Sequence, residues 1–247
     1  MTIKLLVSVT NVQEALVALD ADVDIIDLKD PSIGALGALP LNVIKAIVQA
    51  VNKRAIVSAT VGEGHEGIAG LLMAVKQTSA LGVDIIKVAI SSEIMDNILG
   101  NADFSDTLKK LNHVNCKVVA VLFADKSHEL MSLGQFSQIG FFGVMLDTSS
   151  KDGKNLLDHQ SIAELQSFVA LCEQFKLMSG LAGSLRLKHV SNLLDIKPSY
   201  IGFRGGVCLD DDRKSTLDKS RIVEVLSVVK KQQNKVVTAL DMTDSVA

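Results

Sequence analysis

The chain has 247 residues, of which 48% are hydrophobic and 21% charged, and its formal net charge is −3 at pH 7. This length and composition fit one globular domain with an ample core. The slightly acidic balance excludes an extended basic surface for a nucleic-acid backbone, and no apolar run is long enough to span a bilayer. We therefore expect neither a nucleic-acid partner nor a membrane partner.

The cysteines and histidines do not form recognisable metal or disulfide patterns. The cysteines Cys116, Cys172 and Cys208 are odd in number and widely spaced, and the histidines lack HxH and HExxH spacing. A Walker sequence is absent too, and the N-terminal segment lacks the layout of a signal peptide. The sequence predicts a cytoplasmic protein with no metal site and no cofactor.

Short apolar or β-branched runs recur along the chain and predict strands. Several are apolar throughout, as expected for parallel strands that are covered on both faces. The eight candidate strands span residues 3–8, 23–28, 55–60, 83–90, 117–123, 142–147, 176–182 and 199–204.

Helix signals lie between these runs. Asn11 followed by Glu14, and Ser161 followed by Glu164, have the spacing of an N-cap residue and its capping-box acid. Residues 221–231 have the periodicity of a last helix, after the eighth strand. Strand and helix therefore alternate along the whole chain.

Eight such units predict an α/β fold, a single TIM (β/α)₈ barrel that forms one catalytic domain over residues 1–232. Residues 233–247 show no packing stripe and end in small and polar side chains, so we expect a flexible C-terminal tail. A doubly wound open sheet is the structural alternative.

In a TIM barrel, the loops after the C-terminal ends of the strands build the active site. Several predicted strands carry charged residues at or near these ends. They are Asp27, Lys29, Lys87, Asp147, the following Lys151, and Arg204.

Lys29 is the leading candidate nucleophile. Asp27 and Lys29 are two residues apart in a strand and project to the same face. A neutral lysine amine attacks an aldehyde or ketone to form a Schiff base, and Lys87 and Lys151 would favour the neutral form. Asp147 or Lys151 could then move protons. The alternatives are a solvated Lys29 in a simple turn, and Lys151 as an ordinary surface charge.

Two glycine-rich loops, LAGSL at 181–185 and FRGGV at 203–207, follow the seventh and eighth strands. Many barrels bind phosphate at this place through backbone N–H groups. The alternative is that the glycines only serve tight turns. The predicted phosphate ligands are Gly183, Ser184, Arg204, Gly205 and Gly206.

Five blocks occur in a distinctive order. They are DIIDLKDPSIGALG at 24–37, VSATVG at 57–62, DIIKVA at 84–89, MLDTSSKDGKNLLDHQS at 145–161, and LAGSLRLKHV with IGFRGGVC between 181 and 208. Together they resemble the (5-formylfuran-3-yl)methyl phosphate synthases of methanofuran biosynthesis. The resemblance covers about residues 3 to 231.

The resemblance implies a lyase that condenses two molecules of glyceraldehyde 3-phosphate into 4-(hydroxymethyl)-2-furancarboxaldehyde phosphate, with loss of phosphate and water. It implies Lys29 as the Schiff-base lysine and Lys151 as the general acid or base. Asp27, Lys87 and Asp147 would complete the catalytic set.

The chain departs from the family pattern in two loops. The segment at 62–71 is shorter than expected for the family, and the segment at 208–218 is unusually acidic. Two functional alternatives stay open. One is another Schiff-base aldolase or isomerase that acts on a phosphorylated carbonyl compound. The other is a barrel that binds a phosphorylated metabolite without catalysis. The expected partner is a small phosphorylated aldehyde, and a homo-oligomer is compatible with the sequence.

Overall fold

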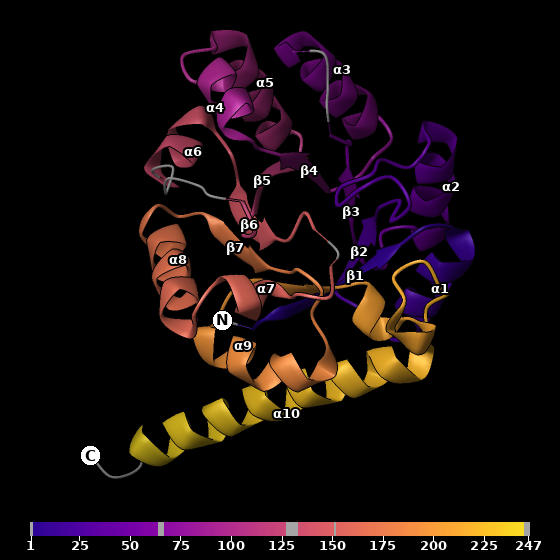
Figure 1. Cartoon of the computed structure of the whole chain (residues 1–247), viewed down its shortest axis with the longest axis vertical. Coiled ribbons are helices and arrows are strands. Elements are labelled where there is room, and N and C mark those ends of the chain that lie inside the picture. The colour runs from indigo at the N-terminus through magenta and orange to yellow at the C-terminus, as the bar shows by residue number, and fades with distance from the viewer. Residues whose placement is uncertain (1, 64–66, 127–132, 151, 245–247) are drawn as a thin grey trace.

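The computed structural model describes residues 2–63, 67–126, 133–150 and 152–244, and only the backbone of 232–244. Its strands are parallel and form a closed barrel in chain order, with β8 returning to β1 (Figure 1). The TIM barrel prediction is confirmed, and the open-sheet alternative is wrong.

Each of the eight predicted strands is present, with ends that differ by one or two residues at most sites. The strands are β1 Lys4–Val9, β2 Ile25–Leu28, β3 Ile56–Thr60, β4 Ile85–Ala89, β5 Lys117–Phe123, β6 Gly143–Asp147, β7 Met178–Leu181 and β8 Tyr200–Phe203.

Helices surround the barrel (Figure 1). The α-helices of the described residues are α1 Val12–Asp20, α2 Leu41–Val51, α3 Gly67–Ser79, α4 Ser92–Ile98, α5 Ala102–His113, α6 Leu133–Ile139, α7 Leu156–His159, α8 Ile162–Gln174, α9 Val190–Ile196 and α10 Lys219–Asp244. Three short 3₁₀ turns are η1 Leu187–His189, η2 Gly205–Val207 and η3 Leu209–Asp211.

The predicted N-caps begin two of these helices. Asn11 accepts a hydrogen bond from the Glu14 backbone N–H at 2.9 Å and begins α1. Ser161 and Glu164 form the full capping box before α8. The Glu14 carboxylate instead accepts hydrogen bonds from the backbone and hydroxyl of Thr10.

The last helix is longer than predicted. We expected a helix over 221–231 and a flexible tail from residue 233, but α10 continues to Asp244. No glycine or proline occurs after residue 219 to break the helix, and Lys, Gln, Ala and Leu in this stretch have good helix propensity. A helix can therefore continue without a packing stripe. Residues 245–247 lie outside the described residues.

Buried apolar side chains form two layers. The larger layer lies between the strands and the surrounding helices. The smaller fills the barrel interior and includes Leu6, Ile25, Met145 and Tyr200. A Cβ atom on Gly180 would lie 2.3 Å from Cζ of Tyr200, so the glycine makes room for the tyrosine ring. This packed interior closes the barrel below its C-terminal end.

The three cysteines are free thiols, and all three are buried in the larger layer between the strands and the helices. Burial raises the pKa of Cys172 to about 12 and that of Cys116 to about 11, so both stay protonated at neutral pH. No described helix has both the length and the apolar character needed to span a membrane.

Candidate active site

Strand register brings two serines to the carboxylate of Asp27. Asp27 on β2 pairs with Ser8 on β1 and with Ser58 on β3. Ser8 Oγ donates to Oδ2 at 2.8 Å, and Ser58 Oγ donates to Oδ1 at 2.6 Å. Asp27 is fully buried, so these hydrogen bonds replace the water that its carboxylate loses.

Lys87 on β4 supplies the opposite charge. Its Nζ lies 2.6 Å from Oδ2 of Asp27, and its side chain is 1% exposed. Among the described residues this contact is an ion pair and not a well-aligned hydrogen bond. A lysine buried this deeply needs a charged partner, and Asp27 provides it.

A second ion pair lies at the mouth of the barrel. Lys29 directly follows β2, and Asp147 is the last residue of β6. Lys29 Nζ lies 3.7 Å from Oδ2 of Asp147, and the two side chains are 9% and 3% exposed. Lys29 is buried, so the alternative of a solvated lysine in a turn is wrong.

A cavity of about 300 Å³ connects these groups to the loops after β6, β7 and β8. Lys29, Lys87 and Asp147 line it, and Asp27 lies directly against Lys87. The structure therefore brings together four of the five predicted catalytic residues. Lys151 lies outside the described residues. The catalytic roles of all five stay predictions.

The loop that leads to Lys151 is held by Asp125, which follows β5. The Asp125 carboxylate accepts hydrogen bonds from the backbone and hydroxyl of Ser149 and from the backbone of Ser150, at 2.7 to 2.8 Å. Burial acts to raise the pKa of Asp125, but these hydrogen bonds outweigh it and hold the pKa well below its ordinary value. The carboxylate therefore stays ionised and keeps this loop against β5.

The predicted phosphate-binding glycines also line the cavity. Gly183 has a φ of +116° and Ser184 a φ of +49°, so both occupy the left-handed region that favours glycine. A Cβ atom on Gly206 would lie 2.3 Å from the Leu185 carbonyl oxygen. Gly206 thus has a packing role, because it lets the loops after β7 and β8 touch. Phosphate binding by these residues stays a prediction.

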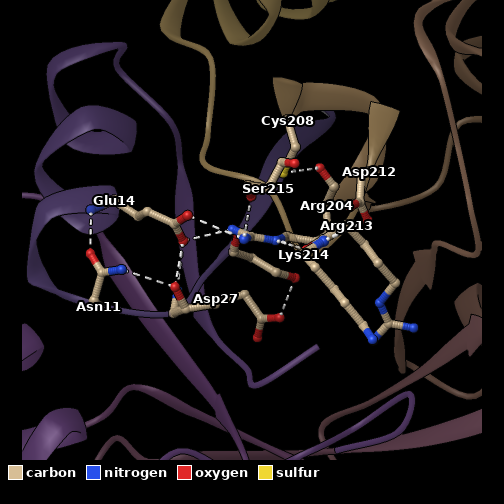
Figure 2. A network of polar contacts seen from close by, with 11 residues as sticks. Asn11, Glu14, Asp27, Arg204, Cys208, Asp212, Arg213, Lys214 and Ser215 are labelled. Atoms are coloured by element: carbon tan, nitrogen blue, oxygen red, sulfur yellow. Dashed lines mark hydrogen bonds and ion pairs between the residues drawn. The ribbon is translucent and has the colours of Figure 1, made fainter. Parts of the chain in front are cut away.

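Arg204, which follows β8, has a different set of partners from the predicted one. Figure 2 shows its guanidinium facing the Glu14 carboxylate, which it binds through Nη1 at 2.6 Å and Nη2 at 3.1 Å. The remaining donors bond to the carbonyl oxygens of Ser8, Arg213 and Ser215. All five N–H donors are thus used, so the arrangement favours a bracing role over the predicted phosphate contact.

Sequence reasoning missed several polar residues of the site. Ser8 and Ser58 had a usable signal, because each is a polar residue flanked on both sides by apolar residues. Glu14 was assigned only to a helix cap, and nothing in the local sequence relates it to a residue 190 positions away. Asp125 also had no motif of its own.

Comparisons with known proteins connect the chain to one family. Residues 5–226 match the family model of 4-HFC-P synthase. A putative (5-formylfuran-3-yl)methyl phosphate synthase of Methylorubrum extorquens is 39% identical over 92% of each chain. The (5-formylfuran-3-yl)methyl phosphate synthase of Methanocaldococcus jannaschii is 33% identical over 92% of this chain and 99% of its own.

Solved structures show the same fold at low sequence identity. Phosphoribosyl anthranilate isomerase of Thermotoga maritima has a TM-score of 0.65 and 11% identity, over 93% of this chain and all of its own. At this identity the likeness concerns the barrel alone.

Proposed function

The chain belongs to the 4-HFC-P synthase family, and from this premise we propose that it forms a furan aldehyde phosphate from two triose phosphates. The proposed substrate is glyceraldehyde 3-phosphate, and the product is 4-(hydroxymethyl)-2-furancarboxaldehyde phosphate, with release of phosphate and water. We propose that this lyase reaction serves methanofuran biosynthesis, as the family resemblance implies. The observation that carries the proposal is the buried Lys29 amine beside Asp147 at the barrel mouth.

The first step is formation of a Schiff base on Lys29. Asp147 Oδ2, at 3.7 Å, is near enough to take a proton from the ammonium after a small movement or through one water. The neutral amine then adds to the aldehyde carbon of one triose phosphate, and the carbinolamine loses its hydroxyl group as water. Asp147 can return the proton to that hydroxyl, so one residue serves both proton transfers.

The iminium group is an electron sink for the carbon next to it. A general base, for which Lys151 is the proposed residue, takes a proton from that carbon and leaves an enamine. The enamine can expel the phosphate of the same triose or attack the second aldehyde. This chemistry accounts for both the released phosphate and the new carbon–carbon bond. Asp27 and Lys87 place a fixed negative and a fixed positive charge beside these steps, and Ser8 and Ser58 prevent the carboxylate from rotating.

The test is borohydride reduction of the protein during incubation with glyceraldehyde 3-phosphate, followed by peptide mass spectrometry. We expect an adduct on Lys29 and, without borohydride, a furan chromophore in solution. Lys29→Ala should abolish both signals. Lys45→Ala, which removes an exposed lysine from α2, is the matched control and should leave both unchanged.

The same experiment separates the alternatives. An adduct on Lys29 without furan product favours another Schiff-base aldolase or isomerase. Absence of any adduct in folded protein, together with tight binding of the triose phosphate, favours a barrel that binds without catalysis. Full turnover by Lys29→Ala would refute covalent catalysis at this residue.

A further inference from the structure

Arg213 lies on the same cavity as Lys29 but was not predicted as a site residue. It belongs to the loop between η3 and α10, and its side chain is half-buried. Figure 2 shows its guanidinium lying apart from that of Arg204. The loop therefore carries a further cation into the mouth of the barrel.

The guanidinium of Arg213 is mostly uncommitted within the described part of the chain. Nη2 donates one hydrogen bond, to the carbonyl oxygen of Gly34 at 2.7 Å, and no described carboxylate forms an ion pair with it. Arg204, by contrast, uses every donor it has. A half-buried arginine without a bound carboxylate is suited to an anionic ligand.

The charge of the cavity favours the same kind of ligand. Although the whole chain carries a net charge of −3, cations outnumber acids among the described residues that line the cavity. The acids are Asp147, Asp211 and Asp212, and Asp27 and Glu14 lie behind the lining as partners of Lys87 and Arg204, so six cations face five acids. The cations are Lys29, Lys87, Arg186, Lys188, Arg204 and Arg213.

Two braces hold the backbone from which Arg213 projects. On one side Arg204 binds the carbonyl oxygens of Arg213 and Ser215, while Glu14 neutralises its charge (Figure 2). On the other side Asp211 forms ion pairs with Arg186 and with Arg221. The backbone of Arg213 is thus held in place before a ligand arrives, and the hydrogen bond to Gly34 orients the guanidinium.

We propose that Arg213 is the arginine that binds a phosphate group of the substrate, and that Arg204 is a positioning residue that acts through the backbone of this loop. The proposal rests on the proposed function for the identity of the substrate, but phosphate binding is separable from the reaction. A phosphate dianion would replace the neutral Gly34 carbonyl as acceptor and gain a charge-assisted, two-point contact. The adjacent Gly183–Ser184 and Gly205–Gly206 segments line the same cavity and offer backbone N–H groups.

The test uses glycerol 3-phosphate and inorganic phosphate as probes, because neither has a carbonyl group and neither can react with Lys29. Binding is measured by isothermal titration calorimetry on the full chain. We expect Arg213→Gln to weaken glycerol 3-phosphate binding by about tenfold or more, as for loss of one charge-assisted bidentate contact. Lys214→Gln removes the same charge from the next, exposed residue and should change the affinity less than about twofold.

Thermal unfolding and circular dichroism confirm that both variants are folded. Equal affinities of wild type and Arg213→Gln would overturn the proposal, as would equal losses in both variants, which would indicate a general charge effect. The absence of saturable glycerol 3-phosphate binding by wild type would overturn it as well. If binding depends on Arg213 but no furan product forms, the proposed function fails while the phosphate contact stands.

Discussion

At the scale of single residues, the two lysine–aspartate pairs differ in depth. Lys87 and Asp27 are almost entirely enclosed, whereas Lys29 and Asp147 lie nearer the opening of the cavity. A charge that is enclosed without its partner costs several kcal/mol, because it can neither reach water nor find another counter-ion. The deeper pair should therefore affect stability more strongly than the outer pair.

We predict that Lys87→Met lowers the free energy of unfolding by about 3–5 kcal/mol, since it leaves the Asp27 carboxylate with its two serines and no cation. Adding Asp27→Asn to this variant should restore most of the loss. A double-mutant cycle by urea denaturation measures the coupling. Additive losses in the double variant would show that the two charges act independently.

The residue positions were predictable where strand periodicity governs them. The two-residue spacing of Asp27 and Lys29, and the place of Asp147 at a strand end, follow from alternation and from the barrel architecture. The partners of Arg204 could not be predicted in this way. They come from α1 and from the loop before α10, and only folding brings these segments together. A local pattern cannot separate an arginine that binds phosphate from one that braces a loop.

At the scale of elements, the loop after β6 depends on a neighbour that has no motif. Asp125, which follows β5, binds the loop through hydrogen bonds from Ser149 and Ser150. The strand ends were predictable to within a residue or two, but this contact between neighbouring loops was not. Loop conformation depends on hydrogen bonds between segments far apart in sequence, whereas a strand depends on its own apolar run.

The lowered pKa of Asp125 gives its contribution to stability a defined pH dependence. Because the pKa in the folded chain lies below the unfolded value of about 3.9, the contribution is complete above that pH and is lost as the pH falls further. Asp125→Asn should lower the urea midpoint at pH 7, and the difference from wild type should shrink at pH 3. Asp152→Asn, an exposed change in the loop after β6, is the control. An equal difference at both pH values would contradict this assignment.

At the scale of the whole molecule, the barrel and the last helix raise the question of where the domain ends. The barrel, its order of strands and the surrounding helices follow from the repeated alternation of apolar runs and helix signals. The C-terminal end of α10 could not be predicted from the sequence. The stretch after residue 232 has no packing stripe, and without glycine or proline it has no signal that ends a helix. The boundary at residue 232 stays a prediction.

The described buried side chains of α10 lie in its first turns, at Ile222, Val225, Leu226 and Val229. Their spacing forms one stripe, and α10 packs through this part against the body of the barrel, including α9. A chain that ends at Gln232 keeps the whole stripe. We therefore predict that its melting temperature stays within about 3 °C of the full chain, a change of roughly 1 kcal/mol for a domain of this size.

The control is Leu226→Ala in the full chain, which removes a buried side chain and should cost about 2–5 kcal/mol. Calorimetry measures the melting temperature of both proteins, and the furan assay measures their turnover. If the shortened chain melts much earlier than full-length protein, or loses turnover, then the distal turns of α10 belong to the folded domain. If it matches the full chain while Leu226→Ala does not, the catalytic domain ends where the apolar stripe of α10 ends.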